Sequence, residues 1–173
     1  MSVSGVAQVN TEASAQEFEE IFLENCDFIY RTAYSITGNC ADAEDVLQNI
    51  FLKLLRREVP PDFGRNPRGY LYRAAVNQSL NTLRSRKRQS AIDDSQLSAL
   101  PSPSPSENDG ELLHRSLAEA VAKLKPKAVE ILTLRYTHNY TDSQIAKMLG
   151  KSRTAVAVSL YRTRSRLKRL LLV

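Results

Sequence analysis

The chain has 173 residues, of which 42% are hydrophobic and 25% charged, the balance of a globular protein. No apolar run approaches the roughly 20 residues that span a bilayer, and the first ten residues lack the basic and apolar segments of a secretion signal. Two cysteines, Cys26 and Cys40, are too few for a disulfide scaffold, so we expect a cytoplasmic protein with reduced thiols and no membrane insertion.

Charge is distributed along the chain in four blocks of alternating sign. Residues 1–57 have a net charge of −5, residues 58–90 of +5, residues 91–114 of −5 and residues 115–173 of +10. Two basic blocks separated by acidic ones suggest two surfaces for a polyanion, each joined to a segment with another partner.

The first two predicted helices are amphipathic. Apolar residues recur at helical spacing from 18 to 36, and a second helix with one broad apolar face follows from Asp42, a good N-cap, to residue 55. Its early carboxylates could suggest a metal site, but N-capping and compensation of the helix dipole explain them better. Side chains away from part of the apolar face could contact a partner protein: Gln48, Asn49, Leu52 and Lys53.

A third helix is predicted from Pro67 through about Arg88. Arginines and asparagines spaced by three or four residues form one stripe along it: Arg73, Asn77, Asn81, Arg84 and Arg88. Asparagine amides between arginines suit base edges that are flanked by phosphates. Aromatic rings nearby could stack on unpaired bases. Tyr72 fits the core better, whereas for Phe63 the sequence favours neither role over the other.

Residues 91–110 alternate proline with serine and then become acidic, so they cannot bury enough apolar surface to offset their ordering entropy. We interpret them as a flexible linker, with a long functional loop as the alternative. The linker separates an N-terminal domain at 12–90 from a C-terminal domain at 111–173. Both domains are predicted to be all-α, because no alternating apolar pattern is long enough for a sheet.

The last two predicted helices form a helix-turn-helix at residues 141–162. Ala146 is the small residue where the helices cross, Gly150 tolerates a positive φ in the turn, and Val156 locks the second helix. The second helix of such a motif enters the major groove. A plain helical hairpin with a solvated basic face is the alternative.

Basic side chains at the start and end of this second helix indicate DNA as the polyanion. Arg153 lies where base edges are read, Lys151 and Ser152 can reach phosphates, and the run RTRSRLKR at 162–169 extends the positive surface. Enzymatic motifs are absent: the sequence holds no GxGxxG, GxSxG or HExxH. We therefore expect no catalysis, no metal and no cofactor.

Three segments in this order resemble the extracytoplasmic-function (ECF) group of bacterial RNA polymerase sigma factors. DAEDVLQNIFLKL (42–54) resembles the family's polymerase-binding helix in region two, and YLYRAAVNQSLNTLRSRKR (70–88) the helix that reads and melts the −10 element. Residues 117–171 resemble region four, whose helix-turn-helix reads the −35 element. The resemblance implies a region-two-like bundle and a region-four-like domain in a subunit that directs promoter-specific initiation in the bacterial cytoplasm, at the nucleoid.

The resemblance also implies partners and site residues. Core RNA polymerase would be bound through Asp42, Asp45, Gln48, Asn49 and Leu52. The −10 DNA, with a flipped base near Phe63, would be bound through Phe63, Arg73, Asn77, Asn81, Arg84, Arg86 and Arg88. The −35 DNA would be bound through Lys151, Ser152, Arg153, Thr154, Ala157, Tyr161 and Arg164. Many members of the family are held by an anti-sigma protein, which is a candidate third partner.

Two features depart from the family pattern. Tyr70 stands where the family often has tryptophan, and Ala157 and Ser159 stand where the recognition helix usually carries basic side chains. Because one bidentate arginine–guanine contact contributes roughly 1–3 kcal/mol, we expect −35 readout that is weak or that favours thymine methyls.

Two other functions are alternatives to this one. A stand-alone helix-turn-helix regulator, with a ligand-binding or dimerising N-terminal half, would bind duplex DNA tightly without polymerase. A nucleic-acid-processing enzyme would use the carboxylates at 42–45 with a divalent metal. The order and spacing of the three segments favour the sigma factor over both.

Overall fold

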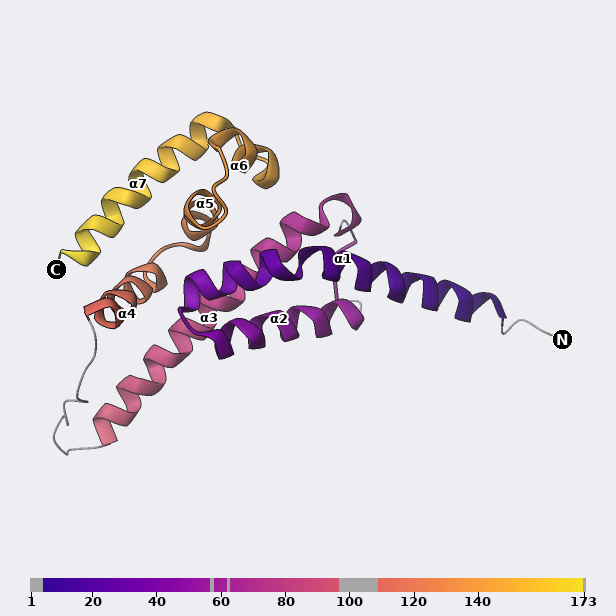
Figure 1. The fold of residues 1–173 in the computed structure, drawn as a ribbon, viewed down its shortest axis with the longest axis horizontal. Helices are drawn as coiled ribbons and strands as arrows, with labels where there is room; N and C mark the ends of the chain where they lie inside the picture. Colours follow the sequence, from indigo (N-terminus) through magenta and orange to yellow (C-terminus); the bar gives the residue numbers. More distant parts are fainter. Residues whose placement is uncertain (1–4, 57, 62, 97–108, 173) are drawn as a thin grey trace.

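The computed structural model describes residues 5–56, 58–61, 63–96 and 109–172. As predicted, this part of the chain is helical and contains no strand. Figure 1 shows the elements in order. They are α1 (Gly5–Thr37), α2 (Cys40–Leu55), the 3-10 turn η1 (Phe63–Arg65), α3 (Pro67–Gln96), α4 (Asp109–Ala122), α5 (Pro126–Tyr136), α6 (Asp142–Leu149) and α7 (Arg153–Leu171). No helix among these residues is long and apolar enough to cross a membrane.

Helices α1, α2 and α3 pack together as the first domain (Figure 1). Their shared core consists of small and aliphatic side chains around one aromatic ring: Ile29, Ala33, Ala43, Val46, Ile50, Leu54, Phe63, Leu71 and Ala75. The predicted N-cap of α2 is wrong. The N-cap is Asn39, three residues earlier, and its side chain accepts a hydrogen bond from the Asp42 amide at 3.0 Å. Asp42 therefore lies in the first turn, where its charge still complements the helix dipole.

The second domain ends in the predicted helix-turn-helix, formed by α6 and α7. Thr141 caps α6 in a reciprocal capping box with Gln144. Gly150 ends α6 in the left-handed conformation, with φ of 64°. The Ser152 hydroxyl then accepts a hydrogen bond from the Ala155 amide at 3.1 Å, which caps α7. These local signals fix the angle at which α7 leaves the turn.

The segment between the domains differs from its predicted limits. Helix α3 continues to Gln96 rather than ending near Arg88, so residues 91–96 of the predicted linker are helical. The sequence AIDDSQ contains no proline or glycine, so no residue there interrupts the helix. Helix α4 begins at Asp109, inside the predicted linker's other end. Residues 97–108, with all the alternating prolines, lie outside the described residues.

The two domains also pack against each other. Phe28 of α1 and the buried face of α3 belong to one continuous hydrophobic cluster with the core of the second domain. Figure 1 shows α5 beside the carboxyl-terminal part of α1 and the middle of α3, and α7 on the outer side of α5. The sequence predicted two domains but gave no indication of this contact.

Candidate nucleic-acid interface

A surface groove of about 710 Å³ runs along α3 beside α2. Arg73, Asn77 and Asn81 line it, all three exposed, so the structure brings the centre of the predicted stripe together on one open face. Lys53 closes the groove from α2, and Tyr70 lies half-buried at one end. The groove, which Gln78 also lines, thus holds two cations, three amides and an aromatic ring, which can contact phosphates, base edges and a base plane respectively.

Arg84 leaves this groove, contrary to the predicted stripe. Its guanidinium donates to the main-chain oxygens of Ala122 and Leu124, at 3.2 Å each, in the second domain. The side chain is half-buried there, whereas Arg88, one turn further along α3, is exposed. Helical spacing placed Arg84 near the stripe, but the contact between the domains determines what its guanidinium binds.

Phe63 belongs to the core rather than to an open face. Its ring is only 6% exposed and packs edge-on against Tyr70, with 5.3 Å between ring centroids. Phe18 contacts it from α1 at 5.7 Å. The expectation that Phe63 meets an unpaired base does not fit this placement. The aromatic side chain that lines the α3 groove is instead Tyr70.

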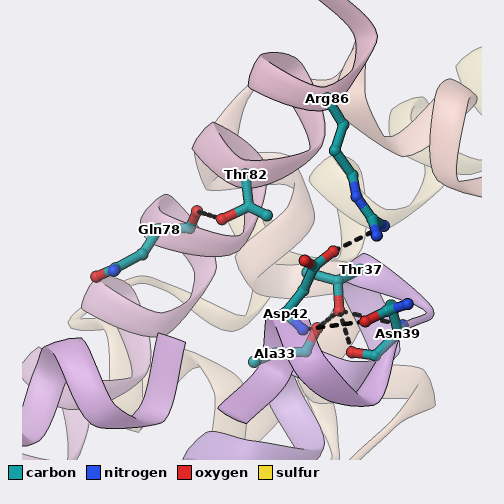
Figure 2. A network of polar contacts seen from close by, with 7 residues as sticks. All are labelled: Ala33, Thr37, Asn39, Asp42, Gln78, Thr82 and Arg86. Atoms are coloured by element: carbon teal, nitrogen blue, oxygen red, sulfur yellow. Dashed lines mark hydrogen bonds and ion pairs between the residues drawn. The ribbon is translucent and has the colours of Figure 1, made fainter. Parts of the chain in front are cut away.

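One of the five candidate polymerase-binding side chains is held in an ion pair, and the other four are exposed to solvent. Asp42 forms an ion pair with Arg86 of α3, beside the Thr37 and Asn39 turn (Figure 2). The remaining four are exposed along α2: Asp45, Gln48, Asn49 and Leu52. Arg86 was predicted to face −10 DNA, and in this structure it is instead the partner of Asp42.

The start of α7 carries the second candidate interface. The predicted −35 residues on its first turns are exposed: Lys151, Ser152, Arg153, Thr154, Ala157 and Tyr161. Tyr161 is the most open of the aromatic side chains here, at 73% exposed. Arg164 lies on another side of α7, with its guanidinium carbon 5.4 Å from the centre of the Tyr136 ring.

A shallow pocket with a volume of about 620 Å³ forms a concave surface where α7 meets the start of α5. Lys125, the residue just before α5, and the Arg162 and Arg166 side chains of α7 line it. Sequence reasoning did not single out Lys125, because it lies 26 residues before Lys151 and only the fold brings it beside α7. These cations extend the basic surface beside the recognition helix.

A buried acid lies close to both basic faces. Burial raises the pKa of Glu130 above its usual value, and the charges of Arg73, Lys151 and Lys127 act in the opposite direction. Two of these cations belong to the two candidate DNA interfaces. Within the described ranges, no cluster of three or more acidic, histidine or cysteine side chains could hold a metal ion.

Comparisons with protein families match the two domains to two separate family models. A model of Sigma-70 region 2 matches residues 21–89, and a model of Sigma-70, region 4 matches residues 114–167. The chain is 30% identical over 161 residues to the ECF RNA polymerase sigma factor SigL of Mycobacterium tuberculosis, covering 92% of this chain and 89% of SigL. It is 28% identical over 164 residues to the ECF RNA polymerase sigma factor BldN of Streptomyces coelicolor, covering 91% of this chain and 61% of BldN.

A solved structure shares the fold. The sigma factor RpoE of Bartonella quintana, crystallised in complex with the anti-sigma factor NepR, superposes with a TM-score of 0.55. The match covers 91% of this chain and 98% of RpoE, at 20% sequence identity.

Proposed function

The chain belongs to the ECF group of RNA polymerase sigma factors, and from this membership we propose how its surfaces divide the work of initiation. The first domain binds core polymerase and the −10 element, and the second binds the −35 element. The observation that carries the proposal is the α3 groove, which gathers Arg73, Asn77 and Asn81 on one open face. The stand-alone regulator is not favoured, because the family models account for both domains.

The α3 groove is the proposed −10 interface. Asn77 and Asn81 offer amides that can pair bidentately with adenine, the base contact that asparagine makes best. Arg73 and Lys53 neutralise phosphates on either side, which positions the strand without reading its sequence. Tyr70 supplies a ring against which a displaced base can stack, the role that the sequence had offered to Phe63.

The first turns of α7 form the proposed −35 interface. Arg153 and Thr154 lie at the amino-terminal end, where a recognition helix meets base edges. Ala157 and Val158 present methyl groups on the exposed face, and these suit the thymine methyl better than they suit guanine. Lys125 and Arg162, which line one concave surface, and the exposed Lys151 just before α7 can bind phosphates.

The exposed side of α2 is the proposed polymerase contact. Leu52 is 44% exposed and Leu55, three residues further along α2, is 48% exposed, so this side offers two apolar side chains to a partner. Asp45, Gln48 and Asn49 surround Leu52 with hydrogen-bonding groups. We propose that the chain has no enzymatic activity of its own, because the polymerase carries out the chemistry, and that it acts in the cytoplasm at the nucleoid.

An anti-sigma factor is a proposed third partner. RpoE, which shares the fold, was crystallised with one. An apolar groove of about 600 Å³ lies between the end of α1 and helices α4, α5 and α7. Leu117, Tyr136 and Leu171 line it and stay partly exposed, and Arg164 and Lys168 lie at its rim. An amphipathic helix with acidic side chains would complement such a groove.

Reconstitution with bacterial core RNA polymerase tests the proposed function. We expect the chain to co-elute with core enzyme on a sizing column and to direct discrete run-off transcripts from genomic fragments. Transcript start sites would then give both promoter elements. No association with core, together with tight, salt-sensitive duplex binding by the free chain, would overturn the proposal in favour of a stand-alone regulator.

A further inference from the structure

The α3 groove contains two rows of polar side chains that differ in exposure. The outer row is exposed and consists of Arg73, Asn77 and Asn81. The inner row lies towards the core that α3 shares with α2, and its residues Gln78 and Thr82 are half-buried. A ligand in the groove would therefore meet hydrated side chains on one side and partly shielded ones on the other.

The side-chain amide of Gln78 is partly shielded but unpaired. The Thr82 hydroxyl donates to the main-chain oxygen of Gln78, 3.1 Å away (Figure 2). The side-chain amide itself has no hydrogen-bond partner among the described residues, and Figure 2 shows it directed away from the Asp42–Arg86 ion pair. A polar group that is shielded from water gains more from a new hydrogen bond than one that water already satisfies. Gln78 is therefore the amide of the groove that a ligand would engage most favourably.

A gap on the surface of α3 separates this amide from an aromatic ring. Tyr70, Ala74 and Gln78 follow one another at intervals of four residues, so each is a surface neighbour of the next. All three line the groove, and Ala74 offers only a methyl group. Tyr70 and Gln78 lie about 12 Å apart along the helix axis. Because helical side chains lean towards the amino end of the helix, the Gln78 amide leans towards the space above Ala74.

This space suits a single unpaired base. An aromatic ring such as that of Tyr70 stacks on a base of any kind, and a glutamine amide pairs bidentately with N6 and N7 of adenine. Lys53, across the groove on α2, supplies a cation for a phosphate of the same strand. A stacking ring, an amide at the base edge and a cation at the backbone together fit an adenine nucleotide of single-stranded DNA.

We propose that the space above Ala74 is a slot for one unpaired adenine of the −10 strand, which stacks on Tyr70 and presents its hydrogen-bonding edge to Gln78. Gln78 is then a specificity-determining residue of this chain. The inference rests on the proposed −10 role of the α3 groove and deepens it, because it names both the base and the residue that reads it.

A change in the hydrogen bonds that Gln78 offers tests this assignment. Glutamate has the length of glutamine but only accepts hydrogen bonds, so Gln78→Glu should read the N4 amino group of cytosine in place of adenine. The probe is oligothymidylate with one central adenine, cytosine or guanine, and fluorescence anisotropy measures its binding to the full-length chain. Gln89→Glu makes the same charge change at an exposed position of α3 outside the groove and is the matched control.

We expect the wild-type chain to prefer the adenine probe over the cytosine probe by about fivefold or more, the discrimination of one bidentate contact. Gln78→Glu should reverse that preference, whereas Gln89→Glu should weaken binding to every probe equally. Asn77→Asp makes the same change in the outer row. A switch to cytosine in Asn77→Asp alone, or an adenine preference that survives in Gln78→Glu, would overturn the assignment.

A second pair of variants tests the slot. Ala74→Leu fills the space, so the adenine probe should bind no better than plain oligothymidylate. Tyr70→Leu keeps an apolar side chain against Phe63 but removes the stacking surface, so binding of the adenine probe should weaken about fivefold or more. Circular dichroism verifies that each variant is folded. An adenine preference that stays intact in both folded variants would refute the slot. Failure of the proposed function would appear separately, as absent transcripts with core polymerase.

Discussion

Arg86 and Asp42 form an ion pair, with 2.8 Å between a guanidinium nitrogen and a carboxylate oxygen, that joins α3 to the first turn of α2 (Figure 2). The Asp42 side chain is 14% exposed and that of Arg86 52%. Family resemblance assigned Asp42 to polymerase and Arg86 to DNA. The pair therefore links α2, the proposed polymerase-binding helix, to α3, the proposed −10 helix, and helps to fix the position of one helix relative to the other.

The first prediction concerns the strength of this link. Asp42→Asn should lower the free energy of unfolding by about 0.5–1 kcal/mol, because the pair is partly shielded from solvent but one partner remains exposed. Denaturant unfolding of Asp42→Asn, Arg86→Gln and the double variant isolates the coupling between the two. Asp45→Asn, at an exposed position on the same helix, should change stability little. Strictly additive losses would show that the pair contributes nothing.

The second prediction concerns the α3 groove. Asn77→Ala with Asn81→Ala should impair promoter opening more than polymerase binding, because both amides line the groove and neither faces α2's exposed side. Loss of base contacts worth roughly 1–3 kcal/mol each should slow open-complex formation at least tenfold. Permanganate footprinting measures opening, and co-elution measures binding to core. Gln89→Ala, exposed on the same helix, is the control, and equal loss of both activities would contradict the assignment.

The third prediction concerns the unusual recognition helix. Ala157 is exposed on α7, where the family usually carries a basic residue. Ala157→Arg should tighten binding to duplex −35 DNA. It should also make the slope of log affinity against log salt concentration steeper by about one, because one more phosphate is neutralised. Fluorescence anisotropy at several salt concentrations measures both quantities. Ser116→Arg, which adds the same charge on α4, should leave −35 affinity nearly unchanged. Equal gains in the two variants would indicate a general charge effect.

The sequence predicted the helix-turn-helix well because its signals are local. Gly150 was expected to tolerate a positive φ in the turn and ends α6 with φ of 64°, a role that depends only on its immediate neighbours in the chain. Arg84 and Phe63 could not be placed in this way. A periodic stripe shows which face of a helix a side chain is on, but not whether another domain covers it. Phe63 sits in a three-residue turn and has no periodicity to read.

The fourth prediction concerns the turn of the helix-turn-helix. Gly150 has φ of 64°, and an added Cβ would meet no atom within 4 Å, so any cost of substitution is conformational. Gly150→Ala should lower the free energy of unfolding by about 1–2 kcal/mol, and Gly150→Asn by less. Gly64→Ala is the matched control, because that site is equally open without a positive φ. Equal effects at the two glycines would refute the conformational explanation.

The fifth prediction concerns pH. Burial, followed by the charges of Arg31 and Arg68, lowers the pKa of His138 to about 4, against a smaller opposing effect of Asp27. The ring is therefore neutral at pH 7 while the two domains are in contact. The Thr32 hydroxyl donates to the Phe28 carbonyl, so the 2.8 Å contact with His138 has Nε2 as the donor.

A chain whose domains are apart exposes this histidine, with a pKa near the ordinary 6.5. The chain with its domains in contact then binds fewer protons between pH 6.5 and 4, so the contact should weaken as pH falls through that range and keep a constant strength above it. Energy transfer between dyes on Cys40 and on Ser165→Cys, in a Cys26→Ser background, should decline from pH 7 to pH 5. His138→Gln keeps a donor for Thr32 but does not titrate, so it should flatten the decline. The same decline in His138→Gln would assign it to another group.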